Sequence, residues 1–154
     1  MKVREIMNQP VITVREETTL EETARLMLGH DIGCVPVVNA QGGLCRIITE
    51  SDFAAKEKGF PLSTFRAPQV LGQCMGREGV VRIHEAARQL TARDIISATV
   101  VTLTEEQLID DAAKLMLHYD INRLPVVSEG VPVGIVARHD LLKMMVVSWV
   151  RETE

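Results

Sequence analysis

The chain has 154 residues, of which 46% are hydrophobic and 25% charged, a balance typical of a folded globular protein. Its net charge of -4 argues against electrostatic binding of nucleic acid, which normally needs a basic surface. No apolar run approaches the ~20 residues that span a bilayer, and the N-terminal segment has no apolar signal core. We therefore expect a cytoplasmic protein with neither membrane nor nucleic-acid partners.

The first predicted elements are a short strand and an amphipathic helix. Residues 11–14 are all β-branched, which favours a strand. Thr18 or Thr19, each with a glutamate three residues later, is typical of a capping box that starts a helix. Apolar or small side chains at helical spacing predict one buried helix face, formed by Leu20, Thr23, Ala24, Met27 and Leu28. Gly29 ends this helix.

Two strands and a second helix follow. Residues 35–38 and 44–48 are apolar runs on either side of a glycine-containing turn, and they predict a pair of strands. Proline cannot donate a ladder hydrogen bond, so Pro36 is expected at a strand start or a sheet edge. The pattern Thr49-x-x-Asp52 then opens a second helix. The order is strand, helix, strand, strand, helix.

Residues 59–91 are interpreted as a connector. They contain two prolines and four glycines, and only 83–90 has the pattern of a short helix. The stretch 62–79 shows no period. It is either a plain packed connector or a segment that covers a cleft or contacts a partner.

The chain then repeats itself. At an offset of 89, residues 3–38 align with 92–127 with fifteen identities in 36 positions. Chance alone would give roughly two or three. After a one-residue deletion the match resumes at an offset of 88. We therefore expect an α+β protein with two β-α-β-β-α repeats, at 3–58 and 92–150. Each buries too little surface to be stable alone, so the two should pack face to face.

The final helix, at residues 141–150, is apolar on nearly all sides apart from Lys143. A helix that is apolar all round is normally buried all round. We therefore expect a second copy of the chain to cover it, in a homodimer formed through Leu141–Val150. The alternative is that the connector helix covers its exposed side.

Several features occur in the same order in both copies. An opening R-[ED]-I is followed by V-x-T, a helix with A-x-L-M-L, D-I, h-P-V-V and finally x-x-x-D before a helix. This arrangement resembles the cystathionine β-synthase (CBS) domain, and the tandem pair resembles a Bateman module. The resemblance covers most of the chain outside the connector.

The resemblance implies a pseudo-two-fold disc with two clefts between the repeats. Family members bind AMP, ADP, ATP or S-adenosylmethionine there, and less often NAD. It further implies a stand-alone, non-catalytic sensor that regulates an unknown partner protein, with an adenine nucleotide as ligand and no covalent cofactor. The alternative is a scaffold or dimerisation protein that binds no ligand.

The resemblance also implies ribose-binding residues. The family's clamp is a Thr or Ser three residues before an Asp, which Thr49 and Asp52 match in the first repeat, whereas the second repeat has Ala137 and Asp140. A carboxylate can accept hydrogen bonds from both hydroxyls of a vicinal diol. The same pattern is also a helix cap, and the residues alone leave that alternative open.

Basic and apolar positions complete the implied site. Arg123 matches a family position whose arginine reaches phosphate, and Arg138 and His139 precede a helix, where the dipole favours an anion. Solvated surface charges are the alternative for these three. Thr13 and Thr102 match the V-x-T strand, near the adenine or the phosphates, although threonine is also an ordinary strand former. The expected apolar walls of the base pocket are Val11, Ile12, Val35, Val100, Val101 and Leu124.

Motifs for catalysis and metal binding are missing. His84-Glu85 begins like H-E-x-x-H, but Arg88 stands where the second histidine should be. The sequence has no phosphate-binding glycine loop and no nucleophile elbow. Its three cysteines have neither zinc-ligand spacing nor an even number for a disulfide framework, in agreement with a reducing cytosol. We therefore expect no enzyme and no metal site.

Overall fold

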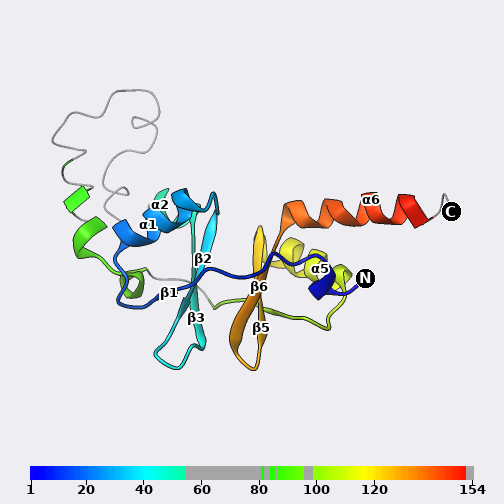
Figure 1. Ribbon diagram of the computed structural model, residues 1–154, viewed down its shortest axis with the longest axis horizontal. Coiled ribbons are helices and arrows are strands. Elements are labelled where there is room, and N and C mark those ends of the chain that lie inside the picture. The colour runs from blue at the N-terminus through cyan, green and yellow to red at the C-terminus, as the bar shows by residue number, and fades with distance from the viewer. Residues whose placement is uncertain (55–80, 82–83, 86, 96–98, 152–154) are drawn as a thin grey trace. The chain divides into compact units, whose positions relative to one another are not determined.

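The chain folds into two compact units, described by a computed structural model for residues 1–54, 81, 84–85, 87–95 and 99–151 (Figure 1). Side chains are described up to residue 146, apart from residue 54. The first-repeat unit contains residues 13–41 together with the described part of 45–100. The second-repeat unit contains residues 1–12, 42–44 and the chain from 101 onward.

The first-repeat unit is built from five elements of the predicted kinds. They are β1 (Val14–Arg15), α1 (Leu20–Gly29), β2 (Cys34–Val38), β3 (Leu44–Thr49) and α2 (Glu50–Ala54). The strands form one sheet in the order β1-β2-β3, and β1 runs parallel to β2 with Val14 opposite Val37. The buried core of this unit consists of Val14, Leu20, Met27, Val35, Val37, Ile48, Ala92 and Ile95.

The second-repeat unit has the same order of strands and α-helices, with a 3-10 helix added before its last α-helix. Its elements are β4 (Leu103–Thr104), α5 (Ile109–Tyr119), β5 (Arg123–Ser128), β6 (Val131–Ala137), the 3-10 helix η4 (Arg138–Leu141) and α6 (Leu142–Arg151). β4 is parallel to β5, and β5 is antiparallel to β6. The core consists of Val3, Ile6, Met7, Leu103, Ile109, Ala112, Met116, Leu124, Val126 and Val136. The predicted α+β repeat is confirmed.

The helix ends explain two patterns in the sequence. At the start of α1, the Thr19 hydroxyl accepts from the Glu22 N–H at 3.2 Å, and the Glu22 carboxylate accepts from the Thr19 N–H at 3.1 Å. The predicted capping box is confirmed at Thr19. After α1 and α5, Asp31 and Asp120 adopt the left-handed conformation with φ of 51° and 52°. Aspartate tolerates this region better than most residues, which accounts for the repeated D-I.

Three local predictions were wrong. The first strand begins at Val14 rather than at residue 11. Pro36 lies inside the central strand β2, not at a start or an edge, and Pro125 has the same place in β5. The parallel strand β1 pairs with β2 only from Val37 onward, and β4 pairs with β5 only from Val126 onward. The missing N–H of each proline therefore costs no hydrogen bond to the parallel neighbour.

The third error concerns the helix faces. Leu28 was expected to be buried, but it is 84% exposed, and Leu117 at the matching position of the second repeat is 78% exposed. Successive helical residues turn by about 100°, so Leu28 lies about 80° from Leu20, on the side away from Met27 and Thr23. The buried face of α1 is formed by Leu20, Thr23 and Met27.

The segment that opens each sequence repeat packs on the other repeat. The 3-10 helix η1 (Val3–Glu5) belongs to the second-repeat unit, and its counterpart η3 (Ala92–Asp94) belongs to the first-repeat unit. Val3 donates from its N–H to the carbonyl of Gln107 at 2.9 Å, and Ala92 donates to the carbonyl of Thr18 at 2.8 Å. Both Val3 and Ala92 are fully buried. We call these segments, residues 1–12 and the described residues 91–95, the lead-in segments. Each completes the core of the repeat that it does not open.

The last helix is only partly buried within its own unit. Leu141 and Met144 pack against the core, whereas Leu142, Met145 and Val146 are 52%, 73% and 66% exposed. The homodimer that would cover this face stays a prediction. None of the helices in the described parts of the chain is long and apolar enough to cross a bilayer.

The connector is described only near its end. Residues 84–85 and 87–89 are helical, within the expected helix at 83–90. The stretch 62–79 and Cys74 lie outside the described residues.

Candidate functional site

Asp140 is the buried acid around which the candidate site of the second-repeat unit forms. It lies in η4 and is only 3% exposed. Its Oδ2 accepts from the Ala137 N–H at 2.8 Å and from Asn8 Nδ2 at 2.7 Å. The cap role that the sequence left open is therefore present in the structure. The capping bond uses only Oδ2 of the Asp140 carboxylate.

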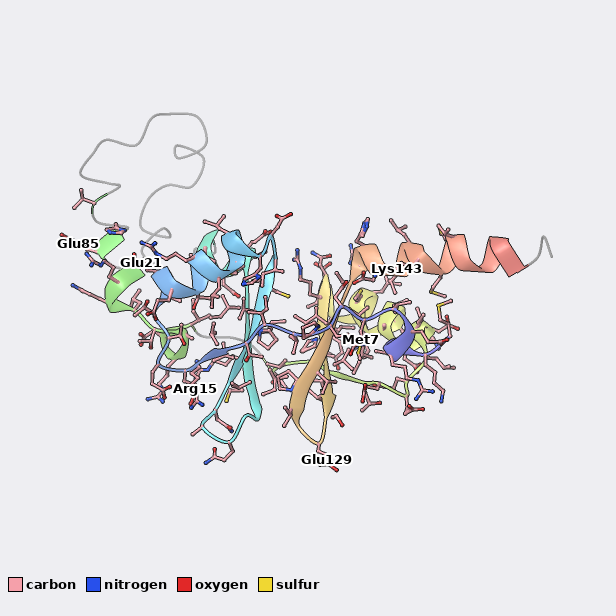
Figure 2. All side chains as sticks on the ribbon, viewed as in Figure 1. Met7, Arg15, Glu21, Glu85, Glu129 and Lys143 are labelled. Atoms are coloured by element: carbon pink, nitrogen blue, oxygen red, sulfur yellow. The ribbon has the colours of Figure 1, made fainter. Side chains whose placement is uncertain are left out.

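The other oxygen of Asp140 faces a lysine. Nζ of Lys143, in the first turn of α6 (Figure 2), lies 2.6 Å from Oδ1 of Asp140 and donates to the Ile6 carbonyl at 3.2 Å. The Lys143 side chain is 46% exposed and the Asp140 side chain 5%. The lysine therefore neutralises a buried carboxylate while keeping access to water.

Asn8 reaches Asp140 because the lead-in segment pairs with β6. Its N–H donates to the Ile135 carbonyl at 2.8 Å, and the Ile135 N–H donates back at 3.1 Å. Close approach at the neighbouring position needs glycine, since a Cβ on Gly134 would lie 2.7 Å from Sδ of Met7. Asn8 was missed in the sequence, where the only signal is that its counterpart Ser97 is also small and polar.

A shallow groove flanks this pairing. It is lined by Gln9, Pro10, Val11, Pro132 and Val133, which adjoin Asn8 along the lead-in segment and Gly134 along β6. Its walls are more apolar than polar, as a flat aromatic base requires. Of the expected pocket walls, only Val11 lines it. Val35 and Leu124 are fully buried in the cores of the two units.

The expected basic residues gather at the same end of the β5-β6 hairpin as Asp140. Arg123 lies opposite Ala137 in the strand register. Ala137 itself precedes the buried Asp140 by three residues. Arg138 and His139 follow Ala137 directly and are exposed. The structure thus brings Arg123, Arg138 and His139 to the end of the β5-β6 hairpin where η4 begins. The first backbone N–H groups of η4 lie at the same end.

The first repeat holds its own acid differently. Asp52 is 2% exposed, and its Oδ2 accepts from the Thr49 N–H at 2.7 Å and from the Thr49 hydroxyl at 3.2 Å. The predicted Thr49–Asp52 pair therefore forms within the first-repeat unit. Thr13 and Thr102 directly precede β1 and β4 and are half-buried.

The other groups that could react or bind a metal show no sign of doing so among the described residues. Burial and the nearby Glu16 raise the pKa of the Cys45 thiol, which keeps it protonated. Among the residues that the structure describes, no cluster of three metal-binding side chains is present, and no buried side-chain nitrogen or oxygen lacks a partner.

Comparison with known proteins agrees with the two-repeat architecture. The CBS domain family model matches residues 3–59 and 92–147. The uncharacterized protein MJ1426 of Methanocaldococcus jannaschii is 32% identical over an alignment 157 positions long, which covers 95% of this chain and 92% of that protein.

Solved structures give the same answer. The CBS domain of a CBS domain containing membrane protein from Sphaerobacter thermophilus superposes with a TM-score of 0.76 at 43% identity, covering 93% of this chain and 86% of that one. The CBS domain pair of protein MJ0100, in complex with 5′-methylthioadenosine and S-adenosyl-L-methionine, gives a TM-score of 0.68 at 25% identity and covers 96% and 98%. With two repeats that match the family model, each with a three-stranded sheet, the chain belongs to the CBS domain family.

Proposed function

We propose that this protein is a non-catalytic regulatory module that senses an adenosine-containing ligand. The observation that carries the proposal is the buried carboxylate of Asp140, which lies at the basic end of the β5-β6 hairpin and accepts a hydrogen bond from Asn8, the residue that precedes the partly apolar groove in sequence. A ribose diol, a flat base and a phosphate are the three chemistries that such a neighbourhood accommodates. The adenosine derivatives bound by the similar MJ0100 pair support the same ligand class.

The two acids favour different ligands. In the second repeat, Arg123, Arg138 and His139 accompany Asp140, which favours a phosphorylated nucleotide such as AMP, ADP or ATP. In the first repeat, Glu50 and Ser51 stand at the positions of Arg138 and His139, and a glutamate repels phosphate. S-adenosylmethionine, which carries a positive sulfonium, is the better candidate beside Asp52.

A ligand screen tests the proposal. The melting temperature of the full chain is measured with AMP, ADP, ATP, S-adenosylmethionine, 5′-methylthioadenosine and NAD, with GMP as the matched purine control. A ligand at about 100 times its dissociation constant stabilises the folded state by about 2.7 kcal/mol, a readily visible shift. A melting temperature that none of the adenosine compounds raises above the GMP control would contradict the proposal.

A second candidate function is assembly without a ligand, which the exposed apolar face of α6 favours. We propose that this face joins two copies of the chain in a cytoplasmic homodimer that acts on a regulated partner protein. Burial of one Leu- or Met-sized side chain contributes about 1.5–3 kcal/mol, so Leu142, Met145 and Val146 across a two-fold axis would support association. A constitutive dimer with no ligand response would favour the scaffold function over the sensor.

A further inference from the structure

We propose that Lys143 is an internal competitor for Asp140, so that ligand binding in the second-repeat unit exchanges the lysine ammonium for a ribose hydroxyl. The inference rests on the proposed function, because it assigns to Asp140 the ribose of an adenosine compound. It names a residue outside the implied site, and it makes the affinity of that site adjustable by one side chain.

The hydrogen-bond capacity of the carboxylate carries the argument. Each carboxylate oxygen accepts about two hydrogen bonds. Oδ2 of Asp140 already accepts two, from the Ala137 N–H at 2.8 Å and from Asn8 Nδ2 at 2.7 Å. A vicinal diol must therefore bring both of its hydroxyls to Oδ1. Nζ of Lys143 already lies 2.6 Å from that oxygen, which leaves room for one hydroxyl only.

The lysine is the partner that can move. Asp140 is 3% exposed and is tied to the backbone of Ala137 and to Asn8, which is itself paired with Ile135. The Lys143 side chain is 46% exposed on a flexible four-carbon stem, and its ammonium is strongly hydrated once free. Its second contact, the Ile6 carbonyl at 3.2 Å, does not depend on the carboxylate. Exchange therefore displaces the lysine and leaves the acid in place.

The competitor belongs to one repeat only. At the offset of 88 that joins Asp52 to Asp140, the residue matching Lys143 is Ala55. The first repeat instead supplies the Thr49 hydroxyl, where the second has Ala137. The two copies of one motif thus carry different polar partners for the acid. The lysine adds a binding cost in the second repeat that alanine cannot add in the first.

The experiment compares two nucleosides in three proteins by calorimetry. Asp52→Ala is the parent, so that binding reports the second-repeat site, and Lys143→Met and Lys143→Arg are added to it. The probes are adenosine, which has the diol and no phosphate to attract a lysine, and 2′,3′-dideoxyadenosine, which lacks both hydroxyls. Methionine keeps much of the apolar stem and removes the charge, whereas arginine keeps the cation.

Lys143→Met is expected to tighten adenosine binding about five-fold, the scale of a partly exposed ion pair, and to change dideoxyadenosine binding less than two-fold. Lys143→Arg is expected to bind adenosine as the parent does. Equal or weaker adenosine binding in Lys143→Met overturns the inference, and so does parallel tightening of both nucleosides, since a merely structural change would affect both alike.

The failure of the inference is separable from that of the proposed function. If the wild-type chain binds adenosine and Lys143→Met does not tighten it, only the inference is overturned. If the wild-type chain binds none of the adenosine compounds of the ligand screen, the proposed function fails and the inference with it. If it binds one of them but the Asp52→Ala parent does not bind adenosine, only the inference is overturned. Should the methionine variant melt below the assay temperature, Lys143→Gln replaces it. The neutral amide is expected to tighten adenosine binding by a smaller factor, and a factor of one or less overturns the inference.

Discussion

Nη2 of Arg93 lies 3.2 Å from Oε1 of Glu17, and the residues that match this pair at an offset of 89, Arg4 and Glu106, form the same ion pair in the other unit. Each arginine comes from a lead-in segment and each glutamate from the repeat on which that segment packs. The reciprocity explains why both residue types are identical in the two copies. They attach a distant stretch of chain to each core.

This attachment predicts a pH dependence. Hydrogen bonding from Lys2, with the nearby charge of Arg4, holds the pKa of Glu106 below its ordinary value of 4.5. A lowered folded-state pKa means that the stabilisation is complete above pH 4.5 and is lost as the pH falls through the lower folded value. Glu106→Gln should therefore lower the melting temperature slightly at pH 7, and its difference from the wild type should be smaller at pH 3.

Circular dichroism melts at both pH values check this. Glu129→Gln, at the tip of the β5-β6 hairpin (Figure 2), removes the same charge from an exposed turn and serves as the control. An equal difference between Glu106→Gln and the wild type at pH 7 and pH 3 would contradict the assigned role of the ion pair.

Asp140→Ala is expected to weaken AMP and ATP binding in the second-repeat unit by about 10- to 150-fold, since hydrogen bonds to a charged acceptor contribute about 1.5–3 kcal/mol. It should also lower stability by about 0.5–2 kcal/mol, because the cap of η4 is lost. Calorimetry and denaturant melts measure the two effects. Asp52→Ala is the matched change in the first repeat, and unchanged AMP and ATP binding in both variants would rule out the ribose assignment.

Arg123→Ala is expected to weaken AMP and ATP more than adenosine, because only the charged ligands use a guanidinium. Arg123→Lys should restore part of the loss, since it keeps the charge without the planar fork. Calorimetric titration with all three ligands measures the difference. Equal losses for adenosine and AMP would instead mean that Arg123 holds the β5-β6 edge in shape, opposite Ala137.

Gly134→Ala probes the pairing that delivers Asn8. An added Cβ would lie 2.7 Å from Sδ and 3.0 Å from Cγ of Met7, so this buried side chain must move, and 3.3 Å from the Asn8 carbonyl, which must give by a few tenths of an ångström. We expect a stability loss of about 1–3 kcal/mol by overpacking, together with weaker ligand binding. Gly29→Ala, at the last residue of α1, meets nothing within 4 Å and should be neutral or slightly stabilising. Denaturant melts that rank the two variants equally would refute the close approach.

Met145→Glu tests the homodimer. Met145 is 73% exposed on α6, and a charge there should dissociate a dimer formed through this helix. Ser128→Glu, at the exposed end of β5, adds the same charge elsewhere and should leave the mass unchanged. Light scattering at micromolar concentration decides between 17.1 kDa and twice that mass. A wild-type mass of 17.1 kDa would refute the dimer.

The sequence alone determined what depends on local spacing. The capping box at Thr19 and the acid near the start of each repeat's last helix follow from residues three positions apart, and the structure has each of them. The repeat itself follows from aligning the chain with itself at an offset of 89. Periodicity also predicted the buried positions of α1, apart from Leu28. That residue lies at the margin of the apolar stripe, where contact with the rest of the fold decides its exposure.

Only the tertiary structure decided what joins distant parts of the chain. Asn8 and Asp140 are 132 residues apart, and their contact exists because the lead-in segment packs on the other repeat and pairs with β6. The two repeat cores are similar, and no local sequence pattern tells which of them a lead-in segment will complete. Lys143 shows the same limit: in sequence it interrupts an apolar helix, and only its position 2.6 Å from a buried carboxylate reveals it as a partner of Asp140. A buried charge must find its counter-ion wherever the chain brings one.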